Sequence, residues 1–208
     1  MEDFFVHYTL SADGKVNLQI LSMRIISGKY KGKRFDVPHT FKARPTTDFA
    51  KESLFNILSN NYVDFDEQPT ALDLFSGTGS ISLELISRGC GSVVSVEKDF
   101  KHWQFLSRIC HELGDKAWKP LHADVFKFIS KSSSLQGFDI IFADPPYALE
   151  NLGDLPELVL NSELIKYDDN GKSESVFILE HGRNYDFSQH SRFIEHRSYG
   201  SVNFSFFR

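Results

Sequence analysis

From residue 70 onward, short apolar runs alternate with longer segments in which apolar residues recur every three or four positions. The short runs predict buried strands, and the longer segments predict helices with one buried face. Such an alternation indicates a parallel sheet with helices on both faces. The predicted strands are Ala71–Leu74, Val93–Val96, Lys119–His122, Phe138–Ala143 and Val176–Glu180, and the predicted helices are Ser80–Arg88, Phe100–Leu113, Asp124–Ser130 and Glu157–Ile165.

The end of the chain predicts an antiparallel hairpin. Phe193–Ser198 and Val202–Phe207 alternate between apolar and polar residues on either side of Gly200, which is typical of two strands joined by a tight turn. We therefore expect an α/β fold of the Rossmann-like type, with a mostly parallel seven-stranded sheet and an antiparallel C-terminal hairpin.

The first 60 residues predict a small extension made of β-hairpins and a helix. Phe4–Leu10 and Val16–Leu21 flank a turn at Asp13-Gly14, as in a hairpin. Because a second methionine, Met23, follows, residues 1–22 are either an added arm or the product of a start codon placed too early. Two further strands and a helix are predicted at Arg24–Ile26, Lys33–Val37 and Thr47–Ser59. The expected division is an arm at 1–22, a basic extension at 23–60 and a catalytic domain at 61–208.

Composition fits one main domain with a basic N-terminal part. The chain has 208 residues, of which 41% are hydrophobic, and a net charge of -5, so a well-buried core can form. Between Met23 and Lys51, eight basic residues occur with only two acidic ones, so this segment carries +6 and the remainder -11. A local basic patch on an acidic protein favours nucleic acid as the partner of that patch.

Several protein classes are disfavoured. Cys90 and Cys110 are the only cysteines; they lack the number or spacing of a disulfide framework or a metal site and fit a reducing compartment. No apolar run reaches the roughly 18 residues of a membrane span, and Glu2 and Asp3 lack the positive charge that begins a secretory signal. We expect a cytoplasmic monomer without membrane contact or bound metal.

The segment from Asp73 to Ser80 lies where the first strand of the sheet leads into the first helix. Open α/β sheets bind ligands at this position, and glycines let the backbone come close to them. A pyrophosphate site would favour a third glycine where this chain has Ser82. Asp73 instead suits the cationic amino acid end of S-adenosylmethionine. The other residues expected to contact this cofactor are Phe75, Ser76, Gly77 and Gly79.

Acidic residues at the ends of the next two strands predict a nucleoside site. Glu97, with Lys98 beside it, ends the second strand, where a carboxylate can accept hydrogen bonds from both ribose hydroxyls. Enzymes that use NAD also place an acid there, so Glu97 indicates a ribose rather than one cofactor. Asp124 can accept from the adenine amine, cap the following helix, or do both. The residues available to pack on adenine are Val125 and Phe126.

Asp144-Pro145-Pro146-Tyr147 follows the strand predicted at Phe138–Ala143. Two consecutive prolines form a rigid turn without backbone donors, so a carboxylate and carbonyl groups face the pocket. An amine on a purine ring is a poor nucleophile because its lone pair is delocalised. When Asp144 and the Pro145 carbonyl accept hydrogen bonds from the N–H groups of this amine, they favour the geometry that presents the lone pair to an activated methyl group. Tyr147 can stack on a base that has left its own stack.

This pattern predicts methyl transfer from S-adenosylmethionine to an exocyclic amine of a nucleic-acid base. The basic extension predicts phosphate contacts near the pocket, which give affinity and salt dependence without reading sequence. A solvated charged surface is the alternative for these residues. The predicted RNA-binding residues are Arg24, Lys29, Lys31, Lys33, Arg34 and Lys42.

Several motifs follow one another in the order of a known family. They are Arg24-Ile25-Ile26-Ser27-Gly28 with Lys31-Gly32-Lys33, Arg44-Pro45-Thr46-Thr47-Asp48 with Glu52-Ser53-Leu54-Phe55-Asn56, the loop from Asp73 to Gly79, Glu97, the turn from Asp144 to Tyr147, and Gly200-Ser201-Val202-Asn203-Phe204. From Met23 onward the chain resembles the bacterial small-subunit ribosomal RNA guanine-N2 methyltransferases of the RsmD type. Residues 1–22 depart from that family.

The resemblance implies the S-adenosylmethionine-dependent methyltransferase fold and a guanine of 16S ribosomal RNA as the substrate. It further implies that this RNA is presented on an assembled or partly assembled small subunit. In this family the stretch that matches Arg44, Pro45 and Thr46 lies beside the cofactor and substrate pocket. The resemblance therefore implies that these three residues contribute to the pocket.

Other functions share parts of the pattern. The same turn occurs in N6-adenine methylases of DNA or RNA and in methylases of protein glutamine, and only the resemblance favours guanine. A ribosome assembly factor that binds RNA without turnover is a non-catalytic alternative, which the intact Asp144 and Tyr147 disfavour. An NAD-dependent oxidoreductase is disfavoured because the sequence offers no candidate for hydride transfer.

Overall fold

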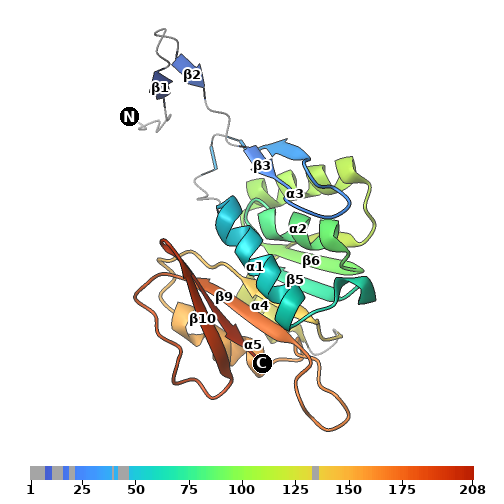
Figure 1. Ribbon diagram of the computed structural model, residues 1–208, viewed down its shortest axis with the longest axis vertical. Coiled ribbons are helices and arrows are strands. Elements are labelled where there is room, and N and C mark those ends of the chain that lie inside the picture. The colour runs from blue at the N-terminus through green and yellow to red at the C-terminus, as the bar shows by residue number, and fades with distance from the viewer. Residues whose placement is uncertain (1–7, 11–15, 19–21, 39, 42–46, 133–135) are drawn as a thin grey trace.

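The computed structural model describes residues 8–10, 16–18, 22–38, 40–41, 47–132 and 136–208. The strands of its central sheet are β5 (Thr70–Leu74), β6 (Ser92–Glu97), β7 (Trp118–His122), β8 (Ile140–Ala143), β9 (Val176–His181), β10 (Phe193–Tyr199) and β11 (Val202–Phe207). They are arranged in the order β10-β11-β9-β8-β5-β6-β7 (Figure 1). Strands β5 to β9 are parallel, whereas β11 is antiparallel to both β9 and β10. The predicted sheet, with its antiparallel C-terminal hairpin, is confirmed.

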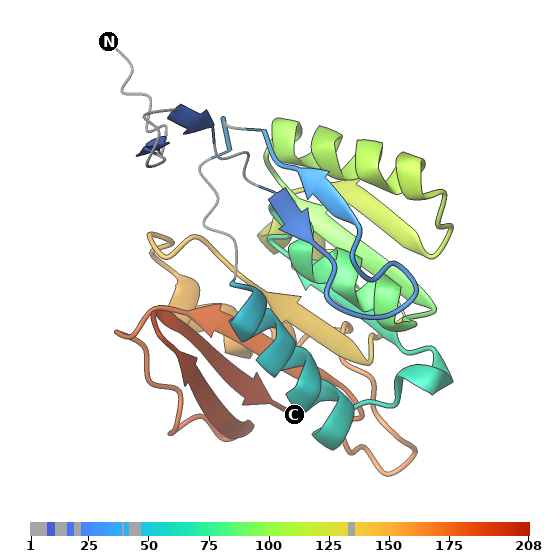
Figure 2. The same cartoon turned by 45° about the horizontal axis from the view of Figure 1, so that its top comes forward.

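Helices cover both faces of this sheet (Figure 2). One face carries α1 (Asp48–Asn61), α2 (Ser80–Arg88) and α3 (Phe100–Leu113), and the other carries α4 (Val125–Ser130) and α5 (Leu155–Leu160). In the part of the chain that the structure describes, two 3-10 helices, η1 (Phe65–Glu67) and η3 (Leu152–Asp154), lie in the connections. Among the described residues, no helix is both long enough and apolar enough to cross a membrane.

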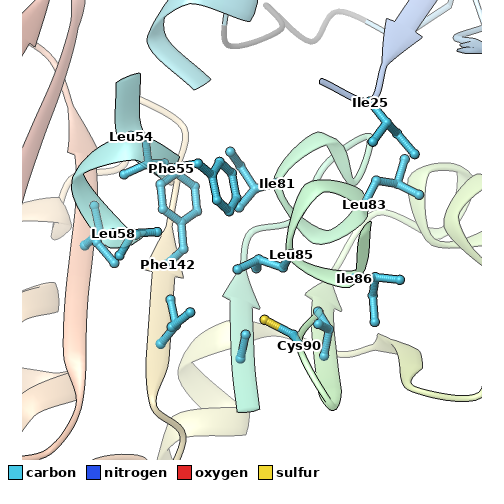
Figure 3. Close-up of a cluster of buried hydrophobic side chains, with 14 of the residues drawn as sticks. Ile25, Leu54, Phe55, Leu58, Ile81, Leu83, Leu85, Ile86, Cys90 and Phe142 are labelled. Carbon is cyan, nitrogen blue, oxygen red and sulfur yellow. The ribbon is translucent and has the colours of Figure 1, made fainter. Parts of the chain in front are cut away.

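Each face has its own hydrophobic core because successive strand residues point to opposite sides. In β8, Phe142 belongs to the core under α1 and its neighbour Ala143 to the core under α5. Figure 3 shows Phe142 beside Leu54, Phe55 and Leu58 of α1. All these side chains are at most 2% exposed, and burying each contributes roughly 1.5 to 3 kcal/mol. Helix α1 is therefore held directly above the strand that leads into the Asp144 turn.

The N-terminal part forms two short antiparallel pairs. Strand β1 (Tyr8–Leu10) pairs with β2 (Val16–Leu18), and β3 (Ser22–Arg24) pairs with β4 (Arg34–Asp36). Both predicted pairings are therefore confirmed, although β3 ends at Arg24, where the predicted strand began, and the turn at Asp13-Gly14 lies outside the described residues. Thr47 caps α1, since its hydroxyl accepts from the Ala50 amide over 3.2 Å.

The loop between β3 and β4 packs tightly against α2. Gly28 has a φ of 79°, and a Cβ atom there would lie 1.8 Å from the Ser87 carbonyl oxygen. This close approach lets the Lys29 amide donate to that carbonyl over 2.7 Å. Glu84, which is fully buried in α2, accepts from the amides of Ile26 and Ser27.

The helix predicted at Glu157–Ile165 was wrong in its position. Helix α5 covers Leu155–Leu160, and Pro156 occupies its first turn, where a missing N–H costs nothing. Ser162 ends the helical stretch by donating to the Val159 carbonyl over 2.7 Å. Ile165 then forms an isolated parallel bridge with Phe138, so the chain has left the helix before the predicted end.

Candidate active site

A cavity of about 1280 Å³ opens at the carboxyl ends of the parallel strands. It lies at the point where the strand order reverses, since the chain runs from β5 through β6 to β7 and then returns to β8 on the other side of β5. This switch point is the ordinary ligand site of open α/β sheets. The volume exceeds the roughly 1,000 Å³ at the upper end of common ligand pockets, so a cofactor and a second group can fit together.

The loop after β5 approaches the cavity with an unusual backbone. Phe75 and Gly77 line the cavity and have φ values of 59° and 53°. Gly79 has a φ of 79°, and a Cβ atom there would lie 2.4 Å from Leu106 Cδ2, so this glycine serves the packing of α2 against α3. The Ser76 amide donates to the Val96 carbonyl over 3.1 Å. Ser76 and Gly79, both predicted cofactor contacts, do not line the cavity.

Glu97 connects this loop to β6. One carboxylate oxygen accepts from the Gly77 amide over 2.8 Å, and the other accepts from the Asp99 amide over 2.7 Å. Glu97 is only 8% exposed and lines the cavity together with Lys98. The carboxylate is therefore held rigidly at the position predicted for a ribose.

Asp124 follows β7, and its position fits both predicted roles, capping the next helix and lining the nucleoside site. Its side chain caps α4 by accepting from the Lys127 amide over 3.2 Å, so the capping interpretation is confirmed. It also lines the cavity and forms an ion pair with Lys98 over 2.9 Å. Val125 and Phe126 line the cavity beside it, and the Phe126 ring meets Phe75 edge to face at 6.2 Å.

Asp73 lies beneath the cavity and does not line it. It is 2% exposed and accepts from both the amide and the hydroxyl of Ser82 in α2. Burial raises its pKa to about 7, with a further contribution from Glu97, against the opposing effect of the Ser82 hydrogen bonds. The expected direct contact with a cofactor is therefore replaced, in this structure, by a contact with α2.

The turn from Asp144 to Tyr147 lies at the centre of the cavity. The Asp144 amide donates to the Leu74 carbonyl over 3.3 Å, which fixes the turn against the end of β5. All four residues line the cavity, with Pro145 buried and Tyr147 45% exposed. The Tyr147 hydroxyl donates to Glu180 over 3.3 Å. Burial and the carboxylates of Glu180 and Asp73 raise the pKa of Asp144 well above its usual value.

The sequence did not identify the part of the cavity that comes from the last strands. Glu180 of β9 and the β10–β11 turn at 199–202 line the cavity opposite the cofactor loop. The turn was visible as Gly200 between two alternating segments. Glu180 gave no signal, because a single acidic residue at the end of an apolar strand has many possible roles. Thr47, Phe100 and His102 also line the cavity.

The basic residues of the β3–β4 loop, Lys29, Lys31 and Lys33, do not line the cavity, and their contacts with RNA stay a prediction. Helix α2 starts at the cavity and ends at the opposite edge of the sheet, and Lys29 packs on its last turn through Ser87. Lys29 also forms an ion pair with Asp115 over 2.7 Å, just before β7 begins. Of the predicted site residues, Lys42, Arg44, Pro45 and Thr46 lie outside the described part of the chain.

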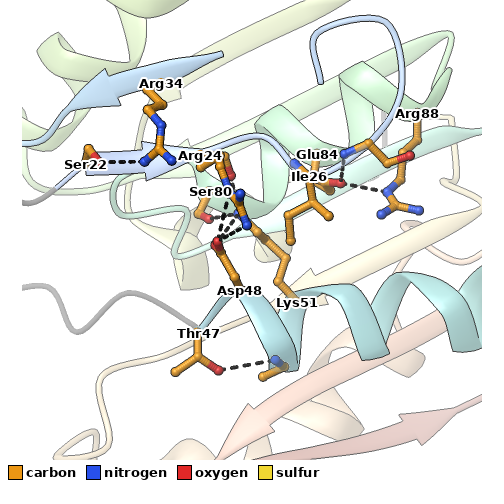
Figure 4. Close-up of polar contacts among 12 residues, drawn as sticks. Ser22, Arg24, Ile26, Arg34, Thr47, Asp48, Lys51, Ser80, Glu84 and Arg88 are labelled. Carbon is orange, nitrogen blue, oxygen red and sulfur yellow. Dashed lines mark hydrogen bonds and ion pairs between the residues drawn. The ribbon is translucent and has the colours of Figure 1, made fainter. Parts of the chain in front are cut away.

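Arg24 is the basic residue that lies near α1. Its guanidinium pairs with Asp48 over 2.8 Å, next to Thr47 at the cavity (Figure 4). Lys51 is buried below this pair, and its ammonium donates to the Arg24 carbonyl over 2.8 Å and to Ser80 over 3.1 Å. Burial lowers the pKa of Lys51.

A model of the family described as "Conserved hypothetical protein 95" matches residues 23–208. The chain belongs to this family. It is the RsmD family, as the motifs predicted. The chain is similar to ribosomal RNA small subunit methyltransferase D of Buchnera aphidicola subsp. Baizongia pistaciae, with 33% identity over 152 residues that cover 73% of this chain and 75% of that relative.

Solved structures of this family's fold agree with the architecture. A hypothetical protein of Thermus thermophilus has a TM-score of 0.75 and 26% identity, covering 89% of this chain and 98% of that chain. The 16S rRNA N2 methyltransferase RsmC of the same organism, in complex with S-adenosylmethionine and guanosine, has a TM-score of 0.62 and 19% identity, covering 90% of this chain and 49% of that chain. The fold is therefore that of S-adenosylmethionine-dependent methyltransferases.

The cavity fits S-adenosylmethionine. Glu97 offers a carboxylate for the ribose, and Phe75, Val125 and Phe126 offer an apolar surface for adenine. The Asp144 carboxylate lines the cavity, where it favours a cationic sulfonium and disfavours a phosphate. The cationic Lys98 is paired with Asp124.

Proposed function

We propose that this protein methylates the exocyclic N2 of a guanine in 16S ribosomal RNA, on an assembled or partly assembled small subunit. The observation that carries this proposal is the rigid Asp144–Tyr147 turn at the switch point of a sheet with a nucleoside-binding cavity beside it. The named RsmD and RsmC relatives favour ribosomal RNA and, for RsmC, guanosine as the substrate.

The chain's own groups position the base. The Asp144 carboxylate and the Pro145 carbonyl accept the two N–H groups of the guanine amine, so the nitrogen lone pair is directed away from them. The Tyr147 ring lies exposed at the cavity and stacks on the extruded base, a contact worth about 1 to 3 kcal/mol. The cofactor supplies a methyl group that its sulfonium charge has already activated, so positioning accounts for much of the acceleration.

Asp144 also receives the proton. When the new N–C bond forms, the guanine nitrogen must lose one proton. A carboxylate with a raised pKa accepts this proton more readily. The raised pKa of Asp144 follows from burial and from Glu180 and Asp73. The positive charge of the bound cofactor favours the ionised carboxylate before transfer.

The test is methyl transfer from labelled S-adenosylmethionine to small subunits from cells that lack this gene, followed by nucleoside analysis. We expect N2-methylguanosine with the wild-type protein and none with Asp144→Ala. The matched control is Asp169→Ala on an exposed loop, which should retain activity. N6-methyladenosine as the product would move the substrate to adenine. No transfer to any RNA would favour a protein amide substrate or a non-catalytic assembly role.

A further inference from the structure

Glu180 lies beside Asp144 at the end of the neighbouring strand. Strands β8 and β9 are parallel, and Ala143 is paired with Leu179, so Asp144 and Glu180 occupy the next positions of the two strands. Because side chains alternate along a strand, both point to the face that carries Phe142 and Ile178. Both carboxylates line the cavity, and Glu180 is 4% exposed.

The position of Glu180 in the sheet assigns it to the substrate and not to the cofactor. The groups that fit S-adenosylmethionine come from β5, β6 and β7, on one side of β8. Glu180 comes from β9, on the other side of β8. A base held by the Asp144 turn would therefore lie between the cofactor and Glu180.

Two adjacent carboxylates offer hydrogen-bond acceptors and no donors when ionised. The edge of guanine that carries N2 presents two neighbouring donor groups, N1–H and the N2 amine. Adenine presents an acceptor, N1, next to its amine, so a carboxylate opposite N1 would repel it. A base that has left the helix is read on this edge.

We propose that Glu180 accepts the N1–H of the target guanine and is the residue that selects guanine over other purines. The inference rests on the proposed function and adds the source of its base specificity. The Tyr147 hydroxyl orients the Glu180 carboxylate by donating to it. The repulsion between the two carboxylates, which contributes to the raised pKa of Asp144, is relieved when guanine places donors opposite both.

Glu180 could instead act only by holding Tyr147 in place. A modified base distinguishes this structural role from base selection. 2-Aminopurine keeps the N2 amine that would be methylated but has an acceptor at N1. A site built to hydrogen-bond a donor rejects an analogue that lacks it by large factors, and here the Glu180 carboxylate would face the acceptor at N1. Glu180→Gln replaces one carboxylate oxygen with an amide donor of the same size, which can pair with the N1 acceptor.

The experiment compares kcat/KM for guanine and for 2-aminopurine at the same position of the RNA. The methylated guanine is first located in small subunits by product mapping. Particles are then reconstituted with RNA that carries 2-aminopurine at that position through a ligated synthetic fragment. Wild type, Glu180→Gln, Tyr147→Phe and the exposed control Glu112→Gln are assayed with both particles.

We expect wild type and Glu112→Gln to prefer guanine by at least about 100-fold, and Glu180→Gln to reduce that preference at least about tenfold or to reverse it. Tyr147→Phe should slow both substrates and keep the preference. If wild type uses both bases equally well, or if Glu180→Gln slows both substrates equally and keeps the preference, the inference is overturned and Glu180 only supports Tyr147. Absence of N2-methylguanosine with wild type would instead overturn the proposed function.

Discussion

The buried ammonium of Lys51 donates to the hydroxyl of Ser80 over 3.1 Å, which joins the first turn of α1 to the first residue of α2. Lys51 is 2% exposed, and its second acceptor is the Arg24 carbonyl. One buried charge therefore holds the N-terminal extension, α1 and the cofactor loop in one arrangement at the edge of the cavity.

Lys51→Met should lower the free energy of unfolding by about 1 to 3 kcal/mol, because two buried acceptors lose their donor. Urea unfolding followed by circular dichroism measures this change. The control Lys116→Met removes an exposed lysine and should change stability by less than about 0.5 kcal/mol. Equal effects of the two substitutions would show that the Lys51 contacts contribute nothing specific.

Gly28→Ala should destabilise the protein more than Gly32→Ala. Both glycines have positive φ values, 79° and 83°, but a Cβ at Gly28 meets the Ser87 carbonyl whereas a Cβ at Gly32 meets nothing within 4 Å. Backbone strain costs about 1 to 2 kcal/mol at either position, and the overlap at Gly28 adds about 1 to 3 kcal/mol. Thermal and urea unfolding of both variants measure the difference. Equal destabilisation would contradict the packing of this loop on α2.

Asp73→Asn should change the pH dependence of stability. The folded state keeps a proton on Asp73 up to about pH 7, whereas the unfolded state releases it near pH 4. Stability from this proton is present below pH 4 and is lost as the pH rises to 7, so the variant should gain up to about 4 kcal/mol relative to wild type over that window. Urea unfolding at pH 4 to 8 tests this, with the exposed Asp169→Asn as control. Parallel curves for wild type and Asp73→Asn would refute the raised pKa.

The double variant Lys31→Gln and Lys33→Gln should weaken binding to small subunits and lower the salt slope by about one for each lost phosphate contact. Because this loop lies at the edge of the sheet opposite the cavity, binding of a short single-stranded RNA should be unchanged. Filter binding over a salt series measures both. Lys172→Gln, on another exposed loop, serves as the control. A loss that is equal for short RNA and subunits would place the loop near the cavity after all.

The sequence predicted those features that depend on local periodicity or on a rare motif. The order of strands and helices followed from apolar spacing, and the reversal at β8 placed Asp144 beside the loop from Phe75 to Gly77. Positions that depend on packing between distant segments were less predictable. The helix expected at Glu157–Ile165 was displaced because Ile165 pairs with Phe138, a contact that no local pattern indicates.

The sequence predicted the side of the site that follows β5, β6, β7 and β8, but not the side formed by β9 and the β10–β11 turn. The groups from β5, β6, β7 and β8 could be found because they follow strands in sequence and have characteristic chemistry. Glu180 reaches the cavity through the register of β9 against β8, which the sequence does not specify. The sequence placed the basic β3–β4 loop near the cavity because its charges suit phosphates. Its actual position depends on the close packing of Gly28 against α2, which charge does not indicate.

The most direct test of the account is the single-turnover rate of Asp144→Asn on small subunits at saturating S-adenosylmethionine. Asparagine keeps the size of the side chain but cannot take the proton from the guanine amine, so the rate should fall by about 100-fold or more. The dissociation constant of S-adenosylmethionine, measured by calorimetry, should rise by about tenfold or less, because Asp144 attracts the sulfonium charge whereas the groups that hold the nucleoside lie on other strands. A variant that forms N2-methylguanosine at the wild-type rate would contradict the role of Asp144 in methyl transfer.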